Sequence, residues 1–475
     1  SLDNTFKTER GIYDNGNARV KWIDPDTGEV RYKDMNGTNQ FDWYPMPWNV
    51  RPESVYTNQW GGNDNYRKIF YQLQVDYAKK FNDVHDVTAM AAFNREQYAT
   101  GSEFEHYRED WVFRATYAYA NKYLAEFNGA YNGSGKFGPD YRFGFFPSGA
   151  IGWVISEENF MNRVKFVDLL KVRGSYGEIG DDNIYDRWLY MDQWEYGQES
   201  SLGSNSGDKS PYTWWRQVRL GNPDIHWEKV TKLNVGVDFS ILKGMIAGNV
   251  DFFQDKRTDI LMKGENRSIP SYFGTTPEVV NKGKVNVRGY EIELRVNKTL
   301  DNGLRRWGNF SMTQSKDKII EGDDQALKDW YQKKAGKQIG QTYSHINGGY
   351  YNTWDEVYGS TPLNTYDDEK LPGNKHIIDF NGDGVIDNFD VVPYGYPERP
   401  QNTFNATIGF NWKGLGCFVQ FYGVTNASRM VDLRSFSGHL NRVYEQGSYW
   451  TKDNTNADVA MPRWNTHNDY PANTY

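Results

Sequence analysis

The stretch Lys232–Leu242, KLNVGVDFSIL, decides the fold, because apolar and polar side chains alternate along it one by one. Successive side chains of a β-strand point to opposite faces, so the pattern predicts a strand with one apolar face and one polar face. After Lys243 and Gly244 the chain returns as MIAGNVDFFQ with the same alternation. Two alternating runs joined by a short glycine turn predict an antiparallel hairpin.

The same pattern recurs along the chain. GYEIELRVN turns at Asp301-Asn302-Gly303, and TFNATIGFNW turns at Lys413-Gly414 before returning as LGCFVQFYG. Together the runs predict about twelve strands of roughly ten residues, the length at which a tilted strand crosses a bilayer. The remaining strands are expected near residues 69–77, 111–121, 122–132, 143–155 and 168–178.

The connections between these strands alternate in length. One set consists of tight turns, whereas the other set is long, at about 179–229, 259–285 and 317–401. Short turns on one side and long loops on the other are typical of an outer-membrane barrel with its long loops outside the cell. The sequence therefore predicts an all-β fold, an antiparallel transmembrane β-barrel with long extracellular loops.

The alternation also predicts which side chains face lipid. Charged residues such as Glu291, Glu293 and Arg295 should line the lumen, because a charge facing lipid is costly. Tyr290, Trp307 and Trp412 are expected in aromatic girdles at the interfaces. A soluble antiparallel sheet with one wet face gives the same alternation and remains open as an alternative. The side chains expected to face lipid are Val235, Val237, Ile292, Leu294, Ile408 and Phe410.

The composition excludes several classes of protein. The chain has 475 residues, a formal net charge of −8 and no basic run, so a nucleic-acid partner is disfavoured. Cys417 is the single cysteine, which rules out a disulfide framework and a cysteine zinc site. The seven histidines are scattered, and neither H-E-x-x-H nor G-x-S-x-G occurs, so no enzyme is expected.

The stretch Asp379–Asp390, DFNGDGVIDNFD, predicts a calcium site. Oxygen-bearing side chains fall at positions 1, 3, 5, 9 and 12, with Gly384 at position 6, as in a calcium loop. The bound Ca²⁺ would be structural and would pin a long loop. Mg²⁺ is the closer rival, and an Asp/Gly-rich turn without an ion is the plain alternative. The expected ligands are Asp379, Asn381, Asp383, the Val385 carbonyl, Asp387 and Asp390.

Aromatic residues in the 179–229 loop predict ligand contact. Trp194, Tyr212, Trp214 and Trp215 could stack on sugar rings or on peptide side chains. Packing within the loop, or contact with a partner protein, is the alternative explanation for the same residues.

Ordered blocks over roughly residues 65–465 resemble the C-terminal barrel of SusC/RagA-type TonB-dependent outer-membrane transporters. The block at 371–424, LPGNKHIIDFNGDGVIDNFDVVPYGYPERPQNTFNATIGFNWKGLGCFVQFYGV, is similar to the family's "pG…DlNgDGvId…D…iG…P" motif and the strand pair after it. LLKVRGSYGEIGDDNI, NPDIHWEKVTKLNVGVDFSI and VNKGKVNVRGYEIEL are also similar, in the family's order. YGYPERP departs from the family's more usual Gly-Asn/Asp-Pro, and no functional meaning is drawn from it.

The resemblance implies a function and a location. It implies that residues 1–475 are a segment of a 22-strand barrel in the outer membrane of a Gram-negative bacterium, without plug, N-terminal domain and last strands. It implies import of glycans or oligopeptides, with a SusD-like surface lipoprotein as partner and TonB acting through the plug. The alternative from another class is a soluble or surface-attached adhesin, a β-rich module braced by calcium.

Overall fold

The computed structural model of the chain is almost entirely antiparallel β-sheet. It describes residues 64–100, 104–184, 186–201, 209–264, 267–273, 276–365, 367–429 and 450–455, together with the short stretches 2–7, 10–12, 19–23, 27, 30–34 and 55–57. Two compact units divide it: Ser1–Val75, Met90–Val112 and Tyr131–Gly135 form one, and Asp76–Ala89, Phe113–Ala130 and Lys136–Tyr475 form the other. In the part that the structure describes, no helix has the length and apolar character needed to span a membrane.

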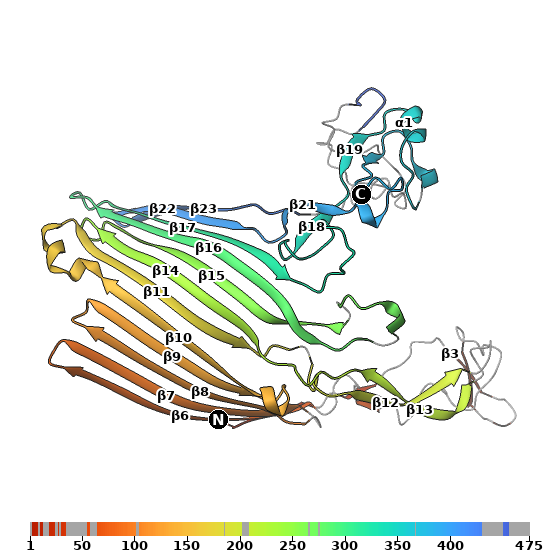
Figure 1. The fold of residues 1–475 in the computed structure, drawn as a ribbon, viewed down its shortest axis with the longest axis horizontal. Helices are drawn as coiled ribbons and strands as arrows, with labels where there is room; N and C mark the ends of the chain where they lie inside the picture. Colours follow the sequence, from red (N-terminus) through yellow and green to blue (C-terminus); the bar gives the residue numbers. More distant parts are fainter. Residues whose placement is uncertain are drawn as a thin grey trace. The chain divides into compact units, whose positions relative to one another are not determined.

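One large sheet contains thirteen of the described strands, in the order β1-β6-β7-β8-β9-β10-β11-β14-β15-β16-β17-β22-β23 (Figure 1). The thirteen strands lie in the sheet in the same order as in the chain, so the sheet is a meander with smaller elements inserted in some connections. Its strands are β1 (Leu2–Lys7), β6 (Asp64–Phe81), β7 (His85–Thr100), β8 (His106–Tyr119), β9 (Tyr123–Ser134), β10 (Phe143–Val154), β11 (Val167–Asp181), β14 (Glu228–Ile241), β15 (Ile246–Met262), β16 (Val280–Thr299), β17 (Arg305–Glu321), β22 (Asn402–Trp412) and β23 (Leu415–Thr425).

Smaller elements occupy the connections and the N-terminal part of the chain. The two-stranded sheets are β2 (Arg10–Ile12) with β5 (Val55–Thr57), β3 (Arg19–Ile23) with β4 (Val30–Asp34), β12 (Gln193–Ser201) with β13 (Lys209–Arg219), β18 (Gln341–Ser344) with β21 (Val392–Pro397), and β19 (Asn347–Tyr350) with β20 (Lys375–Ile377). The described α-helix is α1 (Trp354–Tyr358), and short 3-10 turns lie at Pro139–Tyr141, Ile155–Glu157, Asn159–Arg163, Ser271–Phe273, Asp367–Glu369 and Asn388–Asp390.

The tight turns form where the sequence predicts them. Residues with positive φ close the predicted hairpins at Lys243-Gly244, at Gly303 and at Lys413-Gly414. Glycine accepts this left-handed conformation without a steric cost, which explains why each turn carries one.

Strand length departs from the prediction. The strands from β6 to β17 in the large sheet have 12 to 20 residues rather than about ten. The pairing of β16 with β17 extends beyond the alternating run, to Lys284 opposite Glu321. The loops are correspondingly shorter than expected, because strand residues reach 181, 262 and 321 on their near sides.

The register produces continuous rows of like side chains across the sheet. One row runs Val172, Val237, Val250, Ile292, Met312 and Phe404 through five successive strand pairs. The neighbouring row on the other face runs Arg173, Gly236, Asp251, Glu291, Thr313 and Thr403. We call these two surfaces the apolar face and the polar face of the sheet.

Large side chains of the apolar face are exposed to the surroundings. Phe252 is 61% exposed and Ile408 is 62% exposed, while Val235 and Phe410 are also exposed. Val237, Ile292 and Leu294 are partly covered by their neighbours on the same face. Contiguous exposed apolar surface of this extent marks a contact with lipid or with protein.

An ion pair on the polar face spans three strands. Arg173 of β11 reaches across Gly236 of β14 to Asp251 of β15, with Arg173 Nη1 2.7 Å from Asp251 Oδ1. A Cβ at position 236 would lie 2.4 Å from the same Asp251 oxygen, so glycine is required for this approach. Asp238 lies 3.2 Å from Arg173 Nε and completes the cluster.

Trp307 lies on the polar face, so its expected place in a lipid-facing girdle is wrong. It is paired with Asn297 and Gly409, whereas the neighbouring Gly308 is paired with Val296 and Ile408. Its indole lies across Gly409, where a Cβ would come within 2.5 Å of the ring. The glycine opposite leaves the space that the aromatic ring fills.

Leu294→Arg tests the assignment of the apolar face to lipid. Counted from the turn at Asp301, Leu294 is near the middle of a membrane-crossing stretch, so the change should cost about 2–4 kcal/mol of folding free energy in a bilayer. The measurement is chemical unfolding of the full-length protein in lipid vesicles. Ser311→Arg is the matched control, because Ser311 lies beside Phe310 at the same depth on the polar face. An equal loss from both changes would contradict the assignment.

Candidate functional site

A group of buried apolar side chains lies where the connections meet the strands of the sheet. Phe137 and Phe146 pack with Trp227, at ring-centroid distances of 5.2 and 5.4 Å from it. Phe146 belongs to β10 and the other members come from connections, so the group fixes the bases of several loops against the sheet. The group comprises Phe137, Phe146, Ile184, Leu189, Ile225, Trp227 and Val279.

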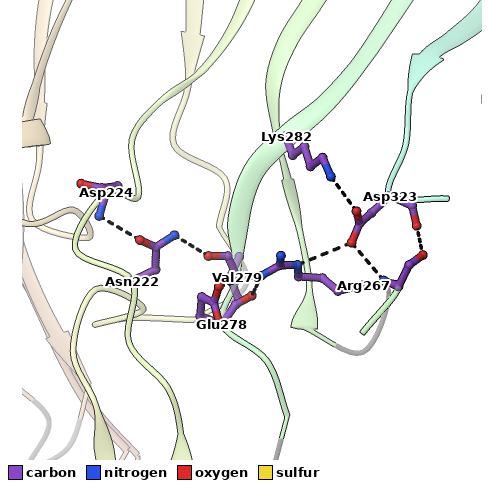
Figure 2. A network of polar contacts seen from close by, with 8 residues as sticks. Asn222, Asp224, Arg267, Glu278, Val279, Lys282 and Asp323 are labelled. Atoms are coloured by element: carbon purple, nitrogen blue, oxygen red, sulfur yellow. Dashed lines mark hydrogen bonds and ion pairs between the residues drawn. The ribbon is translucent and has the colours of Figure 1, made fainter. Parts of the chain in front are cut away.

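We call the long connections, at about 179–229, 259–285 and 317–401, the loop layer. A polar network lies within it (Figure 2). Asp323, just after β17, accepts a hydrogen bond from Lys282 Nζ at 2.7 Å and one from the Ser268 amide at 2.9 Å. Arg267 binds Glu278 at 2.7 Å and lies 3.5 Å from Asp323. The network therefore connects the 263–279 loop to the ends of β16 and β17.

A second part of the network holds the segment before β14. Asn222 Nδ2 donates to the Val279 carbonyl at 2.7 Å, and Asn222 Oδ1 accepts from the Asp224 amide at 3.0 Å (Figure 2). Asn281 makes a comparable set of bonds and donates to the carbonyls of His226 and Asp259. Two asparagine side chains thus satisfy backbone groups that would otherwise have no partner between loops.

The environment of Asp323 favours its charged form. The hydrogen bond from Lys282 lowers the pKa of the Asp323 carboxyl, and the Ser268 amide and the Arg267 guanidinium act in the same direction against partial burial. Asp323 therefore remains a carboxylate to a lower pH than an ordinary aspartate and holds the loop in that charged form.

The connection between β17 and β22 is a folded unit and not an extended loop. Its interior contains Tyr331, Tyr351, Ile377 and Ile386, all buried. Burial raises the pKa of Tyr331, and the hydroxyl of this residue donates to the Phe389 carbonyl at 2.8 Å. Trp450, from beyond β23, closes the unit by donating to Asn352 at 2.9 Å.

Asp390 is the fully buried polar centre of this unit. Its Oδ1 accepts from the amides of Phe380 and Asn381, at 2.7 and 3.2 Å, and its Oδ2 accepts from the Asp387 amide at 2.8 Å. Both oxygens therefore bind the backbone of the predicted calcium stretch. Asp390 fastens the two ends of the stretch together, a role that the sequence did not predict for it.

The other predicted ligands organise the same stretch. Asp379 accepts from the Gly384 amide at 2.9 Å, and Asn381, Asp383 and Asp387 each accept from the amide two residues later. These Asx-type turns coil the stretch tightly, with Gly382 and Gly384 at positive φ. Within the ranges that the structure describes, no three His, Cys, Asp or Glu side chains converge closely enough to hold a metal as they stand.

The predicted aromatic ligand contacts lie on a hairpin instead of in a loop. Trp194 of β12 pairs with Gln217, and Trp215 of β13 pairs with Tyr196. Trp194 is 56% exposed and Trp215 is 62% exposed. The side chains of Tyr212 and Trp214 lie outside the described residues. Alternation in KSPYTWWRQVR is weak, and for this reason the strand escaped prediction.

A second exposed aromatic surface, which the sequence analysis does not predict, lies on α1. Trp354 and Tyr358 lie one helical turn apart on α1 with their rings stacked at 5.8 Å, and Tyr358 is 80% exposed. Thr353 begins the helix by accepting from the Glu356 amide. The spacing of these aromatic residues, four apart after a capping threonine, is the signal that could have revealed them.

Comparison with known proteins agrees with the fold. No family model matches the chain. A TonB-dependent receptor P3 of Formosa agariphila is 27% identical over 372 residues, which cover 74% of this chain and 35% of the relative. The TonB-dependent receptor SusC of Bacteroides thetaiotaomicron is 27% identical over 386 residues, which cover 73% of this chain and 37% of SusC.

Solved structures of the RagAB peptide transporter share the architecture. One superposes with a TM-score of 0.64 at 16% identity, over 85% of this chain and 47% of that chain. A second, the RagAB peptide importer in an open-open state, gives a TM-score of 0.65. These comparisons confirm the predicted transmembrane barrel fold. The chain spans about a third of the length of the curated relatives that it matches.

The relatives and structures confirm the SusC/RagA-type resemblance and place the chain in the outer membrane of a Gram-negative bacterium. In barrels of this kind the apolar face meets lipid and the long connections lie outside the cell.

The stability of the loop layer should depend on pH through Asp323. A carboxyl whose pKa is lowered on folding stabilises the fold fully above its unfolded value of about 4, and this stabilisation is lost as the pH falls through the lowered value. The protection factors of residues 263–282 in hydrogen exchange, which are corrected for the slower intrinsic exchange in acid, should therefore fall as the pH is lowered. Asp323→Asn should weaken protection at neutral pH and flatten the acid dependence. Asp301→Asn at a short turn is the control. If the Asp323 variant showed the same acid dependence as the unaltered protein, the stabilising role of Asp323 would be contradicted.

Proposed function

We propose that this chain, a segment of a SusC-like TonB-dependent receptor barrel, is part of an importer that takes up glycans or oligopeptides across the outer membrane. The observation that carries the proposal is the division of the sheet into an exposed apolar face and a charged polar face. A wall of this kind separates lipid from an aqueous path. The similar proteins are receptors and transporters, which supports the same function and supports a protein that is not an enzyme.

The polar face offers the chemistry of such a path. Arg173, Asp238 and Asp251 form a paired cluster, and Glu293 pairs with Arg295 at 3.1 Å. Paired charges present hydrogen-bonding groups to water and to a polar solute without a strong net field. In the whole protein, this face would contact a plug through which TonB supplies energy.

The loop layer is the region proposed to meet the substrate and a SusD-like surface lipoprotein. It carries two exposed aromatic sites, Trp194 with Trp215 on the β12–β13 hairpin and Trp354 with Tyr358 on α1. Aromatic rings bind sugar rings and peptide side chains through the same apolar faces. The RagAB structures are named for a peptide transporter, which favours oligopeptides among the two substrate classes.

The soluble adhesin considered from the sequence has less support. A soluble sheet would bury its apolar rows, whereas Phe252, Ile408 and Val419 are each more than half exposed. Strands of 17 to 20 residues, as in β15 to β17, also exceed those of an ordinary sandwich.

Uptake by the full-length protein tests the proposal. Cells that carry the gene should grow on an oligopeptide or glycan mixture, and deletion of the gene or of tonB should abolish growth on that mixture alone. Trp194→Ala with Trp215→Ala should reduce uptake about tenfold if stacking contributes roughly 1.4 kcal/mol. Trp412→Ala at the opposite end of the sheet is the control. Growth that is independent of tonB would contradict active import.

We also propose a structural Ca²⁺ at Asp379–Asp390. Four acidic side chains within twelve residues repel one another, and a cation relieves that repulsion. The Asx-type turns support the proposal because they place Asp379, Asn381, Asp383 and Asp387 around one coil, with the Val385 carbonyl as a further oxygen donor. Oxygen donors alone favour Ca²⁺ over Zn²⁺. Ligation requires these side chains to move closer together, while Asp390 keeps the coil closed.

Two substitutions separate the ion from the fold of the loop. Asp383→Ala should abolish the protection that millimolar Ca²⁺ gives residues 371–400 in hydrogen exchange, and the barrel strands should remain protected. Asp390→Ala should remove about 3 kcal/mol of local stability with or without Ca²⁺, because three backbone amides lose their buried acceptor. Asp368→Ala, an exposed acid outside the stretch, is the control. Protection that does not respond to Ca²⁺ in the unaltered protein would overturn the calcium site.

A further inference from the structure

A hollow of about 1120 Å³ lies at the short-turn end of the sheet, across β16, β17, β22 and β23. Its lining is predominantly apolar and includes Val296, Ile408, Phe410 and Val419. These four residues share the apolar face, because Val296, Gly308, Ile408 and Val419 are paired in one row and Phe410 lies two residues along from Ile408.

Gly308 lines the hollow at the centre of this row and has no side chain that would occupy it. Its neighbours across the strands, Val296 and Ile408, are both branched. A Cβ at Gly308 would meet the Thr407 carbonyl oxygen at 3.5 Å, an ordinary contact, so the backbone tolerates a larger residue there. The glycine therefore preserves space and is not demanded by the backbone.

Two cations stand at the rim of the hollow. Lys298 and Arg306 are paired with each other across β16 and β17, on the same face as Val296, and both line the hollow. No described carboxylate forms an ion pair with either side chain. Two cations on adjacent strands would repel each other, so an anion between them is favourable.

The same end of the sheet carries residues typical of the membrane–water interface. The Trp412 indole donates to the Asn302 carbonyl at 3.3 Å, and Lys413 Nζ lies 5.0 Å from the centre of the Trp412 ring. Tryptophan and lysine at a strand end are typical of the headgroup region of a bilayer. The short turns lie on the periplasmic side, since the long connections are extracellular.

We propose that this hollow binds one anionic phospholipid of the periplasmic leaflet. Its phosphate lies between Arg306 and Lys298, and one acyl chain fills the space beside Gly308. Arginine binds phosphate through two parallel hydrogen bonds and lysine adds a point charge. The site goes beyond import: it concerns the membrane face of the barrel and does not depend on which solute passes through the lumen.

Native mass spectrometry of the full-length protein, extracted in mild detergent, tests the site. Exposed to phosphatidylglycerol and phosphatidylethanolamine in equal amounts, the unaltered protein should retain one phosphatidylglycerol in preference. Lys298→Glu with Arg306→Glu should weaken its retention at least tenfold. Gly308→Leu should weaken it similarly while both charges remain, because the acyl chain loses its space. Heat-modifiable electrophoretic mobility confirms that each variant is folded, and Arg306→Gln serves as the milder variant if the double change does not fold.

Lys243→Glu is the matched control, since Lys243 is an exposed cation of another short turn that does not line the hollow. It should leave retention unchanged. Equal retention of both lipids, an equal effect of the Lys243 change, or full retention by the Gly308 variant would each overturn the proposal and indicate ordinary annular lipid. None of these outcomes bears on uptake, so the site and the proposed import can fail separately.

Discussion

The constraint on which the structure depends is that a backbone amide in hydrocarbon must find its hydrogen-bond partner within the protein. Water is absent there, and each unsatisfied group costs several kcal/mol. A long antiparallel ladder meets this demand, and the pairings of β14 with β15, β15 with β16 and β16 with β17 join 13, 15 and 16 residue pairs. Side-chain alternation follows from the same ladder, because every second residue faces the lipid. The apolar row from Val172 to Phe404 is its direct consequence.

Glycine has a different purpose on each face of this sheet. On the polar face, Gly236 lets Arg173 cross a whole strand to reach Asp251, and Gly409 accommodates the ring of Trp307. On the apolar face, Gly308 leaves a hollow in the wall. In each case, the missing side chain determines what its cross-strand neighbours can do, so the function of a glycine here is understood only from the register.

Local alternation was sufficient to predict the strands, the tight turns and the face that each residue of β14 to β16 occupies, because these depend on neighbours in the sequence. It failed where a partner distant in the sequence decides the outcome. Trp307 was a separate error: it was expected at lipid because it is aromatic, although alternation with Phe310 and Met312 already places it on the polar face, where Gly409 leaves space for its ring. The β12–β13 hairpin was predicted as a loop, since its strands pair with each other outside the large sheet and their side chains alternate weakly. Strand ends were underestimated, because charged residues that continue a ladder beyond the bilayer resemble a loop in sequence.

The calcium-type stretch shows how far a motif can be interpreted. Residue types and spacing indicate oxygen ligands, and the same side chains coil the stretch by accepting hydrogen bonds from its backbone amides. They did not distinguish a side chain that binds an ion from one that binds backbone. Asp390 accepts three amides with its two oxygens and is fully buried, so the fold of the stretch already depends on one of its acids. A position-12 aspartate has a shorter side chain than the usual glutamate, and here that shorter reach ends on the amides of the loop itself. The loop is therefore held from within by Asp390, and an ion bound by the remaining acids would add to a closure that exists without it.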